Sequence, residues 1–297
     1  MKFYMKISVM TPTYNRGNLL KKLYNSLVQN SGYGVKIEWL IMDDGSTDET
    51  EKIIKEFENE KNSNIEIKYY KQENQGKMVA INNLMGHVTG EYVIDCDSDD
   101  YFTEKAFEIM KEKILKNEKE ENIYGICFFK INKKGENLGK VFTKKRSTLF
   151  DLHFKENDEG ERAILFKTEI RRKYRHRLEK NERFITEARM YYEMDDDNEL
   201  ICCNSPIMIC EYQQEGYTNN IKEQFTENPY GYYKYFQEIL EKDMKGVLFK
   251  KRIYAIKHYI LFSYLTKQYN PKTIKNIENK ILYYILLLPG ILKSKLF

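Results

Sequence analysis

The acidic cluster at residues 95–100 places four aspartates directly after the short apolar run Tyr92-Val93-Ile94. Buried carboxylates repel one another and lose hydration, so a protein core would not tolerate this cluster. Mg²⁺ and Mn²⁺ prefer oxygen ligands, and Asp97 and Asp99 bracket a single residue. Mg²⁺ tends to bind one or two carboxylates and to take other ligands from water and phosphates. The cluster indicates a metal–diphosphate site, although the same residues also suit a turn or a helix cap.

Two further polar loops follow apolar runs earlier in the chain. Residues 11–16 (Thr-Pro-Thr-Tyr-Asn-Arg) follow the run 7–10, and residues 43–46 (Asp-Asp-Gly-Ser) follow the run 37–42. In an open sheet of parallel strands, ligands collect where the strands end. We therefore expect an aromatic ring, a pair of carboxylates and the acidic cluster to meet at one edge of the sheet.

The elements that would position these loops alternate between strand and helix. Near-continuous apolar strands separated by helices indicate an α/β fold with a mostly parallel sheet covered on both faces. Ser46 and Glu49 form a capping-box pattern at the start of one helix. The expected strands are 7–10, 37–42, 65–70 and 92–95, and the expected helices are 18–29, 77–87 and 103–116.

The second half of the chain is less regular. Residues 168–175 have the character of a basic helix, and residues 184–192 have helical character with Thr186 as a candidate cap. Pro206 separates two of the expected strands. The strands expected in this half are 124–131, 162–166, 200–203 and 207–212.

Four motifs in the first hundred residues resemble those of the family 2 glycosyltransferases, which have the GT-A fold. They are residues 8–16 (SVMTPTYNR), 39–48 (WLIMDDGSTD), 74–82 (NQGKMVAIN) and 90–100 (GEYVIDCDSDD). They occur in the order and spacing of that family. In the second half, residues 184–187 and the pair Glu211-Tyr212 with residues 216–220 look like acceptor-side motifs of bacterial capsule and surface-polysaccharide transferases.

The resemblance implies a role for individual residues of the nucleotide-sugar half. Pro12 and Tyr14 would lie against the nucleotide base, and Asp44 would contact the base. Lys77 would lie near the nucleotide or its diphosphate. The resemblance further implies that Asp97 and Asp99 form a DXD motif that holds ribose and a metal ion, Mn²⁺ or Mg²⁺.

The resemblance also implies a catalytic base in the second half of the chain, and Glu187 fits that position. Members of this type invert the anomeric centre by direct displacement, so one base suffices. The chemistry agrees, because a positioned carboxylate can take the proton of an acceptor hydroxyl and a cation stabilises a departing diphosphate.

Structural interpretations compete with these roles. A glutamate at the start of a helix also offsets the helix dipole, which would explain Glu187 fully. Lys77 could be an exposed lysine at a helix start. The run Asp195-Asp196-Asp197 lies between a helix and a strand, and a solvated turn is the favoured interpretation. The four histidines are single and unclustered, and none is assigned a role.

Charge divides unevenly along the 297 residues. From residue 244 onward there are 11 lysines and arginines and one acidic residue, a net charge of +10, whereas the whole chain carries only +4. The five cysteines are scattered and none has zinc-site spacing, which indicates reduced core residues in a cytosolic protein. The N-terminus leads directly into a strand, so we expect no secretory signal.

The basic C-terminal region is amphipathic and aromatic. Residues 244–268 mix apolar side chains with a basic group at 250–252, and residues 281–292 are uncharged but too short to span a bilayer. Helices of this kind favour an anionic membrane surface. The alternative is that they pack on the catalytic domain or on a second subunit, giving a homo-oligomer. No recognised nucleic-acid module accompanies them, so we expect no nucleic-acid partner.

These observations predict a GT-A domain at 1–222, with a nucleotide-sugar half at 1–116 and an acceptor half at 117–222, followed by a helical region at 223–297. The predicted function is inverting transfer of a sugar from a nucleotide donor, with UDP favoured, to a lipid-linked glycan in surface-polysaccharide synthesis. The enzyme would be peripheral on the cytoplasmic face of the cell membrane. The alternatives are a non-catalytic donor-binding scaffold and a sugar nucleotidyltransferase. The nucleotidyltransferase would need a Gly-rich loop where residues 11–14 stand.

Overall fold

The computed structural model describes residues 5–60, 62–211 and 221–294. The expected acceptor-side residues Tyr212 and 216–220 lie outside them. Contacts divide the chain into two units. The first contains the described parts of 1–149, 159–175 and 192–214, and the second those of 150–158, 176–191 and 215–297. Residues 176–191 thus group with the C-terminal helices, and the domain boundary at 222 stays a prediction.

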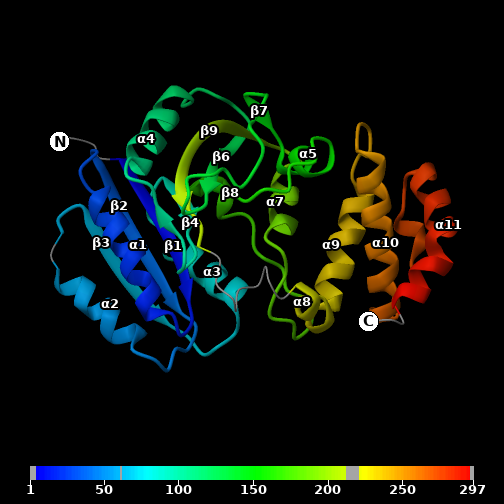
Figure 1. The fold of residues 1–297 in the computed structure, drawn as a ribbon, viewed down its shortest axis with the longest axis horizontal. Helices are drawn as coiled ribbons and strands as arrows, with labels where there is room; N and C mark the ends of the chain where they lie inside the picture. The colour runs from blue at the N-terminus through cyan, green and yellow to red at the C-terminus, as the bar shows by residue number, and fades with distance from the viewer. Residues whose placement is uncertain (1–4, 61, 212–220, 295–297) are drawn as a thin grey trace. The chain divides into compact units, whose positions relative to one another are not determined.

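The first unit is built on a sheet whose described strands run in the order β3-β2-β1-β4-β8-β6-β9-β5, with β7 paired to β9 (Figure 1). The strands β1 to β4 are mutually parallel, as the apolar pattern predicts. The strand β8 runs antiparallel to both β4 and β6, so the sheet is mixed. The strands are β1 Met5–Thr13, β2 Val35–Asp43, β3 Ile65–Lys71, β4 Tyr92–Asp95, β5 Tyr101–Phe102, β6 Ile123–Ile131, β7 Arg146–Ser147, β8 Arg162–Lys167 and β9 Glu199–Ile209.

Helices cover both faces of the parallel strands. Alternate residues of β1 and β2, such as Val9 and Trp39, are buried in one apolar cluster with residues of α1, α2 and α4. The intervening residues Met10 and Leu40 are equally buried, and α3 packs against β1 and β2. The helices of the first unit are α1 Gly17–Gln29, α2 Thr50–Asn59, α3 Lys77–Met85, α4 Ala106–Lys116 and α6 Thr168–Arg171.

Three expectations about local structure are wrong. The basic helix expected at 168–175 ends at Arg171 as α6. Residues 200–203 and 207–212 are not separate strands, because β9 runs continuously from Glu199 to Ile209. Its register against β6 shifts where Phe129 faces Pro206, and a bulge tolerates a residue that has no N–H to donate. The third is the capping box at Ser46 and Glu49, which does not form.

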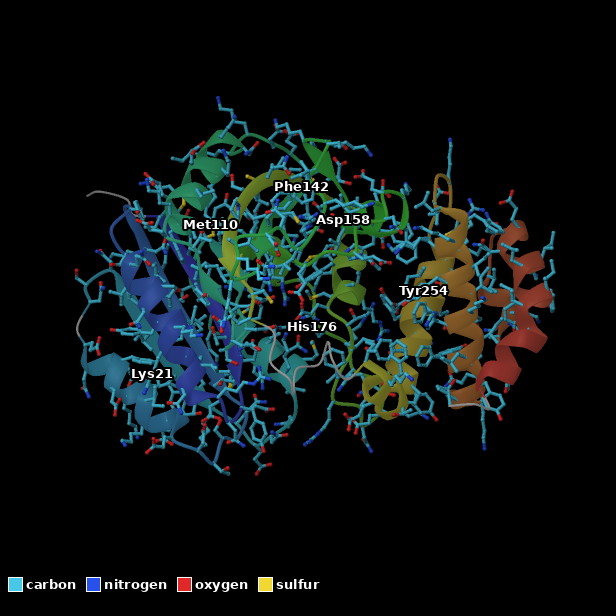
Figure 2. All side chains as sticks on the ribbon, in the orientation of Figure 1. Lys21, Met110, Phe142, Asp158, His176 and Tyr254 are labelled. Atoms are coloured by element: carbon cyan, nitrogen blue, oxygen red, sulfur yellow. The ribbon has the colours of Figure 1, made fainter. Side chains whose placement is uncertain are left out.

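The second unit contains a bundle of helices. They are α8 Ile221–Glu227, α9 Pro229–Glu241, α10 Phe249–Thr266, the 3₁₀ turn η1 Pro271–Thr273 and α11 Ile277–Ser294, with α5 Leu149–Phe154 and α7 Ala188–Met194 lying across the division between units. Aromatic contacts join α9 to α10, including Tyr232 with Phe262 and Phe236 with His258. Tyr254, labelled in Figure 2, also packs on His258. His258 is therefore accounted for by packing.

Within the described part of the chain, no helix combines the length and apolar character needed to cross a membrane.

Candidate active site

The loops that follow β1, β2 and β4 lie at one edge of the first unit, because these three strands are parallel neighbours. Pro12 lies in β1 beyond the last residue that pairs with β4, where β2 alone borders the strand. Pro12 is buried, whereas Tyr14 in the following loop is 47% exposed. The ring of Tyr14 is accessible to a ligand, as the assignment to the nucleotide base requires.

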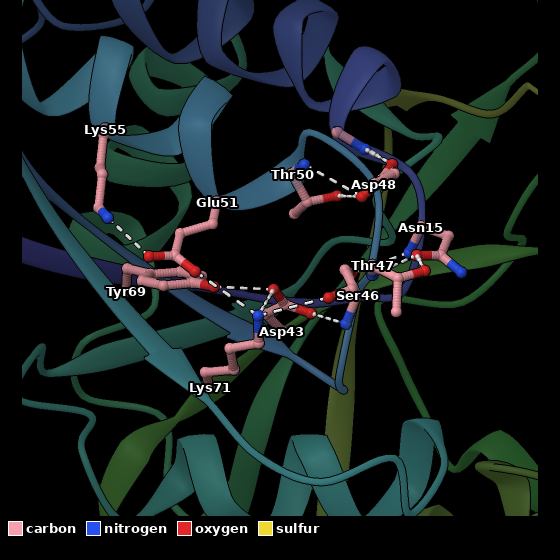
Figure 3. A network of polar contacts seen from close by, with 11 residues as sticks. Asn15, Asp43, Ser46, Thr47, Asp48, Thr50, Glu51, Lys55, Tyr69 and Lys71 are labelled. Atoms are coloured by element: carbon pink, nitrogen blue, oxygen red, sulfur yellow. Dashed lines mark hydrogen bonds and ion pairs between the residues drawn. The ribbon is translucent and has the colours of Figure 1, made fainter.

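The first and second loops are tied together by Asn15. Its backbone N–H donates to Ser46 Oγ at 2.9 Å, and its side-chain Oδ1 accepts from Thr47 N at 2.8 Å (Figure 3). Asn15 adopts a φ of +51°, a left-handed conformation that asparagine tolerates well. This clamp fixes where the loop turns away from the sheet.

The capping box expected at Ser46 and Glu49 does not form. The helix α2 begins at Thr50, and no side chain of Glu49 caps it. Asp48 instead accepts from Thr50 N at 3.0 Å, as Figure 3 shows. The Ser46 hydroxyl accepts from the backbone N–H of Asn15 in the neighbouring loop. This contact competes with the helix cap that the local sequence predicts.

Asp43 ends β2 and Asp44 follows it, and both residues are buried. Asp43 accepts from Ser46 N at 2.6 Å and from the Tyr69 hydroxyl at 2.7 Å (Figure 3). Burial and the Asp43 carboxylate raise the pKa of Tyr69. Asp43 therefore supports the loop from inside.

Asp44 fastens the loop between β3 and α3. One carboxylate oxygen accepts from Gln72 Nε2 at 2.7 Å and from Gln75 N at 2.8 Å, and the other accepts from Gly76 N at 2.8 Å. Gly76 has a φ of +98°, which favours glycine. These bonds set the start of α3, where Lys77 lies. The contact of Asp44 with a nucleotide base stays a prediction.

Lys77 and Asp97, two residues singled out from the sequence, meet in the structure. Lys77 Nζ lies 2.7 Å from Asp97 Oδ1 and 2.8 Å from Oδ2. The lysine comes from the start of α3 and the aspartate from the loop after β4. The alternative interpretation, in which Lys77 is merely an exposed lysine at a helix start, is wrong, since its side chain is only 16% exposed.

Asp99 is paired with a cation from the first loop. Arg16 Nη1 donates to Asp99 Oδ2 at 3.1 Å. Burial raises the pKa of Asp99 to about 6, with the Asp97 carboxylate adding to the rise and the Arg16 guanidinium opposing it. The carboxylates of Asp97 and Asp100 thus lie close enough to Asp99 to repel its charge.

Asp100 is a buried carboxylate that pairs with Lys130, whose side chain is 13% exposed. Lys130 Nζ lies 2.7 Å from Asp100 Oδ2 and 3.6 Å from Glu161 Oε2. Burial alone would lower the pKa of Lys130, but these carboxylates raise it well above its ordinary value. Lys130 lies in the apolar strand β6, and a lysine in such a run is a sequence signal for a buried acidic partner. The motifs of the first hundred residues do not include it.

The acidic cluster has the donor chemistry for a divalent cation. Asp97 and Asp99 supply carboxylate oxygens. Burial, and after it repulsion by the Asp97 carboxylate, raises the pKa of Asp99, and a bound cation would favour the charged carboxylate. Among the described residues, no group of three or more His, Cys, Asp or Glu side chains is arranged to hold a metal ion by itself. Two carboxylates fit a Mg²⁺ or Mn²⁺ ion that takes its other ligands from water and phosphates.

Glu187 belongs to the second unit, in which it directly precedes α7. Its carboxylate is half-buried and accepts from the Tyr191 hydroxyl at 3.4 Å. Within the first unit the structure joins Lys77 to Asp97, and Asp44 binds Gly76, the residue before Lys77. Glu187 is part of the second unit.

Tyr14, Asp44, Asp97 and Asp99 thus lie in the loops that follow three neighbouring parallel strands. The chain belongs to the family of the model "Glycosyl transferase family 2", which matches residues 8–181.

Curated relatives match over part of their length. An uncharacterized glycosyltransferase of Mycoplasma genitalium, MG060, is 38% identical over 110 residues, which cover 36% of this chain and 37% of that protein. The GalNAc(5)-diNAcBac-PP-undecaprenol beta-1,3-glucosyltransferase of Campylobacter jejuni is 33% identical over 142 residues, covering 47% of this chain and 43% of that protein. The matches thus span less than half of these relatives.

Solved structures support the fold. TarS 1–349 of S. aureus in complex with UDP-GlcNAc has a TM-score of 0.60 and 17% identity, covering 97% of this chain and 81% of that chain. The mannosyltransferase PcManGT of Pyrobaculum calidifontis, in complex with GDP-Man and Mn²⁺, has a TM-score of 0.59 and 12% identity, covering 98% and 87%. The predicted GT-A fold is confirmed.

Proposed function

We propose that this protein is an inverting glycosyltransferase that transfers a sugar from a UDP-linked donor to a lipid-linked glycan. The observation that carries the proposal is the pairing of Lys77 with Asp97 and of Arg16 with Asp99. Two cations and two carboxylates lie where three loops meet at the sheet edge. This set of charges suits a metal-bound diphosphate, whose oxygens can bind both a metal and the side-chain cations.

The proposed roles follow from the chemistry of glycosyl transfer. Tyr14 and Pro12 face the base, and Asp44, which fastens the loop between β3 and α3, contacts the base. When bound, Mg²⁺ or Mn²⁺ held by Asp97 and Asp99 would neutralise charge on the diphosphate. Lys77 and Arg16 contribute further positive charge at the departing diphosphate. We assign Glu187 as the base for the acceptor hydroxyl on sequence resemblance alone.

The relatives support the choice of substrates. TarS has been solved with UDP-GlcNAc, which supports a UDP-linked donor. The name of the Campylobacter jejuni enzyme describes a glycan on undecaprenyl diphosphate, which supports a lipid-linked acceptor for this chain. We further propose a place in surface-polysaccharide synthesis.

The C-terminal helices support a position at an anionic membrane surface on the cytoplasmic side. Phe249 on α10 and Ile281 and Ile285 on α11 are 64%, 57% and 65% exposed. Lysines at 250, 257, 275 and 280 are exposed on the same region of the chain. Exposed apolar side chains beside lysines suit the boundary between lipid head groups and acyl chains. A second copy of the chain is the competing occupant.

Release of UDP tests the proposed activity against the scaffold alternative. UDP-GlcNAc and UDP-glucose are incubated with the protein and Mn²⁺, with water as the acceptor, and free UDP is measured over time. We expect slow release that Asp99→Ala abolishes and Asp196→Ala leaves unchanged, since Asp196 is an exposed member of the rival acidic run. Donor binding with no release above the protein-free rate would favour the scaffold.

A further inference from the structure

The segment around Glu187 is fastened to helix α9 within the second unit. We call residues 177–191 the Glu187 segment. Glu182, Arg183, Phe184 and Arg189 of this segment contact α9 or the residue before it, about fifty positions further along the chain. The contacts use different atoms and flank Glu187 on both sides.

Glu182 caps the N-terminus of α9. Its two carboxylate oxygens accept from Tyr230 N and Gly231 N, each at 2.6 Å. The first N–H groups of a helix have no partner inside the helix, and a carboxylate there also favours the helix dipole. A Cβ at Gly231 would lie 2.9 Å from Glu182 Oε2, so the glycine allows this approach. Glu182 therefore joins the segment to the first turn of α9.

Asn228, directly before α9, binds the backbone of the segment. Its Oδ1 accepts from Arg183 N at 3.1 Å and from Phe184 N at 3.0 Å. Its Nδ2 donates to Gln224 O at 3.1 Å in α8. Asn228 is 2% exposed, and loss of its side chain would leave the N–H groups of Arg183 and Phe184 without this acceptor.

Arg189 holds the other side of Glu187. Its Nε and Nη2 donate to the two oxygens of Glu238 on α9, at 2.9 and 2.8 Å. Nη2 also donates to Glu179 at 3.0 Å, and Nη1 donates to the Arg177 carbonyl at 2.9 Å. The planar guanidinium fork matches a carboxylate in a way that lysine cannot. Arg189 is 6% exposed, so this pair is shielded from solvent.

We propose that α9 positions Glu187, with Glu182, Asn228 and Arg189 as the positioning residues. The inference rests on the proposed role of Glu187 as the base. Glu187 lies between the anchors, since Arg183 and Phe184 precede it and Arg189 follows two residues later. Small displacements of a catalytic group are costly to rate. On this proposal α9 is a positioning element for the base.

A double-mutant cycle between Asn228 and Glu187 tests this proposal. The full chain is assayed for UDP release from saturating UDP-GlcNAc with Mn²⁺, and UDP affinity is measured by calorimetry. We expect Asn228→Ala to lower kcat at least about tenfold with UDP affinity unchanged. Asn228→Asp keeps an acceptor oxygen and should restore most of the rate. Gln237→Ala is the matched control, because Gln237 bonds to Lys234 and Glu241 within α9.

The decisive comparison is made in the Glu187→Gln background. If Asn228 acts through Glu187, Asn228→Ala lowers kcat no further there, whereas a general structural defect lowers kcat by the same factor in both backgrounds. Equal factors, or an unchanged kcat in Asn228→Ala alone, overturn the proposal. Should Asn228→Ala fail to fold, Arg189→Lys replaces it in the cycle. Full activity of Glu187→Gln alone refutes the base assignment and is a separate outcome.

Discussion

Lys77 Nζ lies within 2.8 Å of both carboxylate oxygens of Asp97, joining the start of α3 to the loop after β4. The lysine is held in turn by the loop that Asp44 fastens, through Gly76 N at 2.8 Å. Residues from three separate strand ends therefore converge through hydrogen bonds. A nucleotide sugar entering this site would meet a charge already placed for its diphosphate.

Loss of the Lys77 charge should weaken donor binding. A hydrogen bond to a charged group is worth about 1.5–3 kcal/mol, so we expect Lys77→Met to weaken UDP affinity about 10- to 150-fold. Calorimetry with UDP and Mn²⁺ measures the change. The matched control is Lys21→Met, an exposed lysine on α1 that Figure 2 labels. Equal affinities for Lys77→Met and the wild type would remove Lys77 from the site.

Tyr14 should act through its ring. Stacking of a base on an aromatic side chain is worth about 1–3 kcal/mol, so Tyr14→Ala should weaken UDP affinity about 5- to 150-fold. Tyr14→Phe keeps the ring and should bind UDP as the wild type does. The test is a comparison of the three dissociation constants. A large loss in Tyr14→Phe would instead point to a role for the hydroxyl.

Acid should destabilise the first unit through Glu38, away from the site. Glu38 is fully buried on β2 and accepts from Lys68 Nζ at 2.7 Å and Thr89 N at 2.9 Å. Burial by itself would raise its pKa, but the bonds from Lys68, Ser8 and Thr89 lower it below the ordinary 4.5. Because the folded pKa is depressed, the stabilisation is full above about pH 4.5 and is lost as pH falls toward the folded value.

Urea unfolding of Glu38→Gln between pH 7 and pH 3 measures this effect. The variant should be less stable than the wild type at pH 7, and the difference should shrink as the pH falls below 4.5. Glu66→Gln, a half-exposed partner of the same lysines, is the control and should change stability little. A difference between Glu38→Gln and the wild type that is constant with pH would contradict the explanation.

The exposed face of α11 should govern binding to anionic vesicles. Replacing Ile281 and Ile285 together by serine removes apolar surface, and we expect binding to phosphatidylglycerol vesicles to fall at least about fivefold. Sedimentation with vesicles measures the bound fraction, and added salt should weaken it. Val141→Ser, at a residue that is 62% exposed in the first unit, is the control. Unchanged binding would assign this face to a second copy of the chain.

The strands and the converging loops could be predicted because their signals are local. Apolar runs of strand length end in polar loops, and parallel neighbours bring those loops to one edge. The strand Tyr92–Asp95 has the bounds that the apolar pattern indicates. The prediction that the loops after β1, β2 and β4 meet depends only on the alternation of strands and helices.

Contacts between distant residues could not be predicted in this way. Nothing near Asp44 in the sequence indicates that its carboxylate binds the backbone at Gln75 and Gly76. Ser46 likewise binds the backbone of Asn15 and does not form the helix cap that its neighbours in the sequence predict. The fastening of the Glu187 segment to α9 likewise joins residues about fifty positions apart. Such partners depend on how the elements pack, which local patterns do not specify.

We propose above that Asp97 and Asp99 form the metal–diphosphate end of a nucleotide-sugar site. It is tested most directly by UDP affinity measured with and without Mn²⁺, in the wild type and in the double variant Asp97→Asn/Asp99→Asn. We predict that Mn²⁺ strengthens UDP binding at least about tenfold in the wild type and has no effect in the double variant. An equal effect of Mn²⁺ on both proteins would contradict this assignment.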